Sequence, residues 1–91
     1  MYIVVIENTV KQDSIEKYAE VSTRFMNEMK TLPGMMDALV WKDEHNPSQI
    51  LNVMMWESKD ASKADDGSIF LKYKAELRPY FITNTSRTFE C

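Results

Sequence analysis

The sequence predicts a single α+β domain over residues 1–91, with one antiparallel sheet and both helices on the same face. Three features carry this prediction. An apolar, β-branched run opens the chain at Tyr2–Ile6, a helical pattern of apolar residues ends at Pro33-Gly34, and a second apolar run fills residues 50–56. The element order that follows is β-α-β-β-α-β, the split-βαβ or ferredoxin-like arrangement.

The first two elements are a strand and a helix. Tyr2–Ile6 is almost wholly apolar, which is typical of a strand covered on both faces, and we expect Asn8 to end it. Asp13 precedes Glu16 by three residues, the spacing of a capping box at a helix N-terminus. Apolar residues then recur at steps of three and four, which predicts one apolar helix face. They are Ile15, Tyr18, Val21, Phe25, Met29 and Leu32.

The middle of the chain predicts a hairpin. Residues 35–42 form the second strand, 44–48 carry the turn residues Asn46-Pro47, and 49–57 return as the third strand. Trp56 stands at the end of this strand, where a large indole either fills the corner between helix and sheet or forms the wall of a pocket. Ser58 follows as the expected cap of a short helix.

The last part of the chain predicts a helix and a strand. Asp65-Asp66-Gly67 interrupts the short helix, and Ser68 is expected to cap a renewed one. Phe70, Tyr73 and Leu77 share one face of that helix, which Pro79 limits. Phe81–Phe89 alternates well enough for a final strand.

A sheet with both helices on one face leaves its other face uncovered. The apolar strand at Tyr2–Ile6 places either Ile3 and Val5 or their neighbours of opposite parity on that bare face. A second copy of the same sheet is the simplest cover, so we expect a homodimer paired face to face as a dimeric α/β barrel.

Composition excludes several classes of function. The chain has 91 residues and a net charge of −3, without a cluster of basic residues, so nucleic acid is not an expected partner. Cys91 is the only cysteine, which excludes an internal disulfide and fits a reducing compartment. The chain shows neither a leader segment nor an apolar run of about 20 residues, so we expect a cytoplasmic protein without a membrane partner.

Four features together resemble the antibiotic biosynthesis monooxygenase family of dimeric α/β-barrel proteins. They are Leu32-Pro33-Gly34 before the second strand, Trp56-Glu57-Ser58 at the end of the third, Ser68 with Phe70 in the second helix, and Leu77-Arg78-Pro79 before the final strand. The spacing agrees from about Ile3 to Phe89. No single motif among them is specific, whereas the combination is specific for the fold more than for the reaction.

The resemblance implies an oxygenase that needs no metal, flavin or haem, since the substrate of several family members is itself the reductant for dioxygen. That substrate is an electron-rich polycyclic phenol or hydroquinone. Many members carry a histidine in the second helix, where this chain has Asp65. Haem-degrading members resemble the chain at Asn8, but they require an aromatic residue near position 65 and a histidine near Lys74. The chain lacks both, so we set haem aside.

Such a reaction requires a dry slot for a flat substrate and donors for the phenolate that forms. We expect Trp56 and Asn52, which share a strand face with Met54, to provide catalytic contacts. Proton removal falls to solvent, to Asp65 or to the acidity of the substrate itself. The substrate-binding residues expected beside them are Asn8, Tyr18, Phe25, Met54, Phe70 and Tyr73.

Each of these proposed site residues also has a purely structural interpretation. Trp56 can be a core residue, Asn52 can bond a neighbouring backbone, and Asp65 can be a solvated acid at a helix break. His45, the only histidine, lies in the hairpin turn and reads as a surface residue. No acidic, histidine or cysteine cluster predicts a metal site. The rival functions are a binding module without catalysis and an isomerase of a small hydroxy-ketone, for which we identify no acid–base pair.

Overall fold

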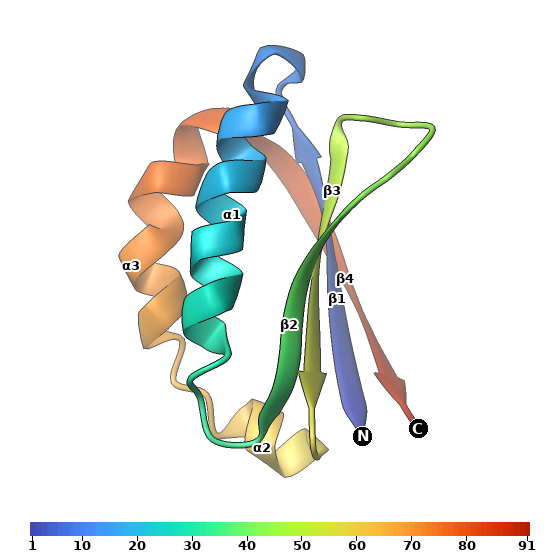
Figure 1. The fold of residues 1–91 in the computed structure, drawn as a ribbon, viewed down its shortest axis with the longest axis vertical. Coiled ribbons are helices and arrows are strands. Elements are labelled where there is room, and N and C mark those ends of the chain that lie inside the picture. Colours follow the sequence, from blue (N-terminus) through green and yellow to red (C-terminus); the bar gives the residue numbers. More distant parts are fainter.

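Four strands form one antiparallel sheet in the order β2-β3-β1-β4 in the computed structural model, which describes residues 1–91 (Figure 1). They are β1 (Tyr2–Val10), β2 (Met35–Lys42), β3 (Gln49–Trp56) and β4 (Phe81–Glu90). β1 pairs with β3 and β4, and β2 pairs only with β3. This topology confirms the predicted ferredoxin-like α+β fold.

The two long helices lie on one side of this sheet, and a short helix lies at its end (Figure 1). The long helices are α1 (Ile15–Met29) and α3 (Ser68–Leu77), and the short one is α2 (Lys59–Lys63). Two 3-10 turns are also present, η1 (Gln12–Ser14) before α1 and η2 (Arg78–Tyr80) after α3. α1 packs on β2 and β3, and α3 packs mainly on α1. None of these helices combines the length and the apolar composition needed to cross a membrane.

β1 is longer than the sequence predicted, because Asn8 does not end it. The strand continues to Val10, and Asn8 lies within it, opposite Ile50 of β3 and Asn84 of β4. The Asn8 side chain is 2 % exposed and donates from Nδ2 to the carbonyl oxygen of Ile50 at 3.0 Å. An asparagine whose amide is bonded in this way can remain inside a sheet.

One of three predicted helix caps is present. Ser58 Oγ accepts a hydrogen bond from the Ala61 backbone N–H at 3.1 Å, as predicted. The capping box at the start of α1 is absent, because Asp13 lies in η1 and accepts from the Ser14 hydroxyl instead. Ser68 does not cap α3 either. Gly67 occupies the cap position with φ +76°, and the carboxylate of Asp66 accepts from the Ser68 backbone N–H.

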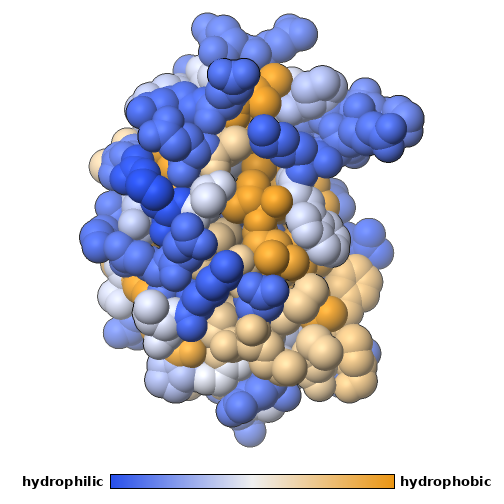
Figure 2. Space-filling view, viewed as in Figure 1, coloured by the Kyte–Doolittle hydropathy of each residue, from blue (hydrophilic) through white to orange (hydrophobic).

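The core lies between α1 and the sheet. The predicted apolar face of α1 is buried from Tyr18 to Met29, whereas Leu32 follows the end of the helix. On α3, Tyr73 and Leu77 are buried against α1, and the Tyr73 ring stacks on Phe25 with the centroids 5.6 Å apart. Figure 2 shows apolar side chains gathered between the helices and the sheet, while the helix surface is mostly hydrophilic.

Successive side chains of a strand point to opposite faces, so the register divides the sheet residues into two sets. One set faces the helices and includes Val4, Ile6 and Met54. The other set lies on the face that no helix covers, and we call it the open face. Its apolar members are Ile3, Val5, Leu39, Trp41, Leu51, Val53, Met55 and Phe89.

Gly34 determines how α2 meets the end of the sheet. Its φ is +81°, and a Cβ at this position would lie 2.6 Å from the Cβ of Ala61 in α2. Its carbonyl oxygen accepts the Glu57 backbone N–H at 2.8 Å, which ties the start of β2 to the end of β3. The Pro-Gly pair therefore does more than stop α1, because its glycine allows the close approach of a second helix.

Candidate functional site

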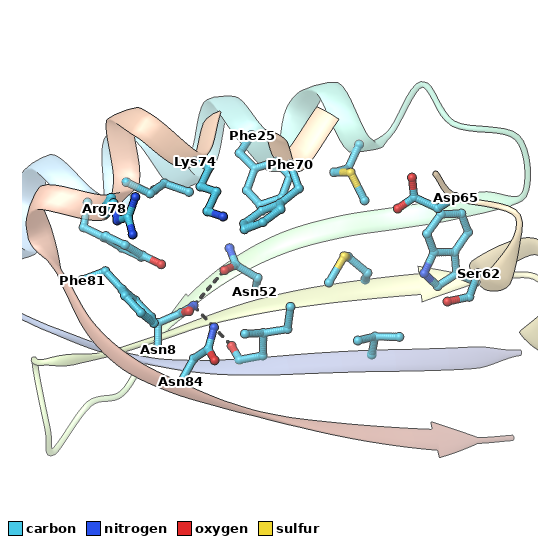
Figure 3. A pocket seen from close by; sticks show the side chains of 17 residues that line it. Asn8, Phe25, Asn52, Ser62, Asp65, Phe70, Lys74, Arg78, Phe81 and Asn84 are labelled. Carbon is cyan, nitrogen blue, oxygen red and sulfur yellow. Dashed lines mark hydrogen bonds between the residues drawn. The ribbon is translucent and has the colours of Figure 1, made fainter. Parts of the chain in front are cut away.

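A cavity of about 530 Å³ lies between the sheet and the helices (Figure 3). This volume is in the range of small-molecule sites, and most of the wall is apolar. The residues that line it come from β1, α1, β3, α2, α3, η2, β4 and the segment between α2 and α3. They are Val4, Ile6, Asn8, Tyr18, Phe25, Met29, Asn52, Met54, Trp56, Ser62, Asp65, Phe70, Lys74, Leu77, Arg78, Phe81 and Asn84.

A chain of buried amides and a hydroxyl crosses one end of the cavity. Asn8 Nδ2 donates to Asn52 Oδ1 at 2.8 Å (Figure 3), and Asn52 Nδ2 donates to Ser22 Oγ at 2.5 Å. The bond from Asn8 to the Ile50 carbonyl fixes the direction of this chain, since a carbonyl can only accept. The Asn8 amide oxygen then has no partner in the protein and is available to accept from a ligand.

Two further polar groups on the wall have no partner in the chain. Tyr18 is 3 % exposed and Trp56 is 2 % exposed, yet neither the phenol O–H nor the indole N–H makes a hydrogen bond within the protein. No buried side-chain nitrogen or oxygen is both sealed from solvent and without a partner. Both polar atoms therefore open onto the cavity that their side chains line, where they can donate to a ligand oxygen.

Burial raises the pKa of Tyr18 to about 12. The hydroxyl consequently remains protonated at neutral pH, since burial disfavours its charged form. In the cavity Tyr18 therefore acts as a hydrogen-bond donor and not as a base.

The raised pKa of Tyr18 predicts a loss of stability in alkaline solution. Above pH 10 the unfolded state ionises this phenol while the folded state does not, so the free energy of unfolding falls by about 2 kcal/mol between pH 10 and 12. Urea unfolding of wild type and Tyr18→Phe at pH 9 and pH 11.5 measures the difference. Equal losses in both proteins would contradict the assignment.

Asp65 and Ser62 lie at the opposite end of the cavity from Arg78 and Asn84 (Figure 3). One carboxylate oxygen of Asp65 accepts the Gly67 backbone N–H at 3.0 Å and so stabilises the break between α2 and α3. The second oxygen has no hydrogen-bond partner in the chain. Asp65 therefore lies at the helix break, as the sequence predicted, and it also lines the cavity.

Of the nine residues that the sequence suggested for the site, eight line the cavity. The exception is Tyr73, which lies in the interface between α1 and α3. There its ring stacks on Phe25, and its hydroxyl donates to the carboxylate of Glu28 at 2.8 Å. Asn52 also differs from expectation, because its oxygen and one N–H are used by Asn8 and Ser22. Asn52 therefore positions Asn8, and only its second N–H is left to donate to a ligand.

Sequence reasoning missed the polar residues at one end of the cavity, namely Lys74, Arg78 and Asn84. Phe70, Lys74 and Arg78 are spaced four residues apart, a spacing that signals one helix face. That signal was available. Asn84 lies opposite Asn8 only through the register of β1 and β4, which the sequence does not reveal.

Two other residues lie away from the site. His45 is exposed in the turn between β2 and β3, and Trp41 is 49 % exposed on the open face of the sheet. No three acidic, histidine or cysteine side chains gather closely enough to hold a metal ion.

Comparison with known proteins assigns the chain to a family. The model of the family described as antibiotic biosynthesis monooxygenase matches residues 1–68. The chain belongs to the antibiotic biosynthesis monooxygenase family. The match reaches from β1 to the first residue of α3 and includes the Pro33-Gly34 turn and Trp56. No curated protein sequence matches the chain at a significant level.

Solved structures extend the similarity to the whole fold. A protein of Nitrosomonas europaea, provisionally assigned as an antibiotic biosynthesis monooxygenase, is 14% identical with a TM-score of 0.87, covering 100% of this chain and 98% of its own. A similarly assigned protein of Deinococcus radiodurans is 15% identical, with a TM-score of 0.83 and coverage of 100% and 92%. A Bacteroides thetaiotaomicron protein of unknown function, described as a possible oxidoreductase, has 12% identity, a TM-score of 0.85 and coverage of 99% and 96%. At these identities the likeness concerns the fold alone.

Proposed function

We propose that this member of the antibiotic biosynthesis monooxygenase family oxidises a phenolic or quinol-type aromatic molecule with dioxygen and without a cofactor. One observation carries the proposal: Tyr18 and Trp56, both almost fully buried, direct unpaired donors into an apolar cavity. An apolar slot with a few placed polar groups suits a flat aromatic ligand.

The chemistry requires stabilisation of an anion. Donors in a dry site favour the phenolate over the phenol, and the electron-rich anion can pass one electron to dioxygen. The resulting superoxide and substrate radical combine at a ring or methylene carbon that still carries a hydrogen. Loss of water from that hydroperoxide leaves a new carbonyl, so one oxygen atom enters the product and the other enters water.

The roles of the residues follow from their contacts. Tyr18 and Trp56 each offer one donor to a polar group of the substrate, and Asn8 accepts from a substrate hydroxyl while Asn52 and Ser22 hold its amide in place. Asp65 has one free carboxylate oxygen on the wall, so it is the proton acceptor within reach of the cavity. Phe25, Phe70 and Met54 contribute flat or adaptable apolar contacts.

Dioxygen uptake tests the proposal. A panel of hydroquinones and an anthrone, supplied to the protein after exhaustive metal removal, should give uptake above the buffer rate. Asp65→Asn distinguishes an acid–base role, since loss of rate in this variant with an unchanged unfolding midpoint supports proton transfer. Absence of uptake with every compound would instead favour the rival function, a binding module that sequesters such molecules without converting them.

The open face of the sheet supports a second part of the proposal, a homodimer paired through its sheets. Val5, Val53 and Leu39 lie side by side there in the register. Val53 is almost fully covered by its neighbours, whereas Trp41 and Phe89 on the same face are 49 % and 41 % exposed. A patch of this kind on a small domain is typical of an interaction surface.

The dimer makes a direct prediction. Light scattering at micromolar concentration should give a mass near twice 10.7 kDa. Leu51→Lys places a charge in the open face and should give the monomer mass, because a buried unpaired charge disfavours the interface. Leu71→Lys is the matched control, since Leu71 is 64 % exposed on α3 and should leave the mass unchanged. A monomeric wild type would contradict the prediction.

A further inference from the structure

Positive charge that no acid of the chain neutralises lies at one end of the cavity. Lys74 and Arg78 line this end and extend from α3 and η2 toward the side where Asn8 and Asn84 lie (Figure 3). Neither forms an ion pair or a side-chain hydrogen bond within the protein, since the four ion pairs use other cations. The only acid on the cavity wall, Asp65, is at the opposite end.

Two cations on the surfaces of α1 and α3 form ion pairs instead. Lys72 Nζ lies 2.6 Å from a Glu28 carboxylate oxygen, and Arg24 lies 2.7 Å from that of Glu76. The chain has 14 acidic and 11 basic residues, so acids are in excess. The four ion pairs use four of the eleven basic residues, so seven are unpaired. Of these seven, Lys74 and Arg78 are the two that line the cavity, where they are available to an anion from outside the chain.

The chemistry at this end favours a carboxylate over a phosphate. The guanidinium of Arg78 can bind a carboxylate through two parallel N–H donors, and the Asn84 amide lies on the same wall. α3 ends here at Leu77, and the negative end of a helix dipole disfavours a dianion more than a monoanion. Phosphate sites usually use the opposite end of a helix.

We propose that the cavity takes a planar aromatic acid whose carboxylate lies against Lys74 and Arg78 while its rings occupy the apolar part near Phe25 and Phe70. The inference rests on the proposed function for the use of the cavity as the substrate site. It narrows the substrate class from phenols and quinols in general to those that carry an acidic group.

A pair of quinone probes, already oxidised and so inert toward dioxygen, tests the charge preference without turnover. Anthraquinone-2-carboxylate and its neutral carboxamide have the same ring system, and isothermal titration calorimetry measures the Kd of each for the whole protein. The acid should bind about tenfold more tightly or better, since hydrogen bonds between charged groups are the stronger kind. Its affinity should fall with added salt, whereas that of the amide should not.

The variants assign the preference to its residues. Lys74→Gln and Arg78→Gln should each reduce the advantage of the acid, and the double variant should abolish it. Lys72→Gln makes the same charge change on the same helix but away from the cavity and should preserve the advantage. All three positions are exposed, and circular dichroism verifies that the four variants fold.

Three results would overturn the inference: equal affinities for acid and amide, no binding of either compound, or an advantage that the double variant keeps. The oxygenase proposal is tested by a different measurement, the uptake of dioxygen. If the acid is preferred but no hydroquinone gives dioxygen uptake, the anion site stands and the oxidation is withdrawn. If uptake occurs without a preference for the acid, the oxidation stands and the anion site is withdrawn.

Discussion

Gly34→Ala should lower the free energy of unfolding by about 2–4 kcal/mol, the largest loss of stability expected from adding one methyl group to this chain. Two costs combine at this position. The backbone has φ +81°, which L side chains rarely adopt, and the new Cβ would lie 2.6 Å from that of Ala61. Either α2 shifts or the turn does, and the bond from Glu57 to Gly34 is strained in both cases. Urea unfolding at neutral pH measures the change.

Gly67→Ala is the matched control. Gly67 has nearly the same conformation, with φ +76°, but nothing lies within 4 Å of the position that a Cβ would take. Only the backbone cost remains, which is about 1 kcal/mol. The difference between the two variants therefore isolates the contact with α2. Equal destabilisation would mean that α2 does not pack against the turn as described.

Trp56→Phe should reduce kcat/KM for dioxygen uptake by about a hundredfold. The substitution keeps an aromatic ring on the wall and removes the unpaired indole N–H, and loss of one donor to a developing anion costs a factor of this order. Tyr18→Phe removes the other unpaired donor with less change in shape and should act in the same direction. Oxygen-electrode rates over a range of hydroquinone concentrations measure both.

Trp41→Phe is the control, because it removes a tryptophan that lies away from the cavity. Trp41 lies on the open face of the sheet, 49 % exposed, so its loss should leave the uptake rate unchanged. The same pair separates the fluorescence signals. Quenching by a bound quinone should persist in Trp41→Phe and disappear in Trp56→Phe. A loss of rate in Trp41→Phe that equals the loss in Trp56→Phe would place the reaction elsewhere.

The strands and long helices were predictable because their signals are local. The apolar run in β3, the turn residues between β2 and β3, and the three-and-four spacing in α1 each lie within one short segment. The caps were less predictable. Asp13 has the spacing of a capping box but bonds Ser14, because η1 intervenes before α1 begins.

Residues of the site could be predicted where the alternation of side chains along one strand determines which face they occupy. They could not be predicted where the pairing register between strands brings them together. Asn52, Met54 and Trp56 follow from a period of two along β3, and all three line the cavity. Tyr73 was expected in the site, but its neighbour on α3, Lys74, lines the cavity instead. Which of the two faces the cavity depends on how far α3 is rotated about its axis against α1. Asn8 and Asn84 meet across strands that are 70 or more positions apart, and no local pattern encodes such a contact.

The central claim is that one atom of dioxygen enters the substrate, and isotope labelling tests it most directly. The protein, freed of metals, is supplied with an anthrone under 18O2, and the product is analysed at once by mass spectrometry. We expect a product that carries one 18O atom per molecule, formed at a rate that Trp56→Phe reduces and Trp41→Phe does not. A product without the label, or formation of labelled product at the buffer rate, would contradict the account.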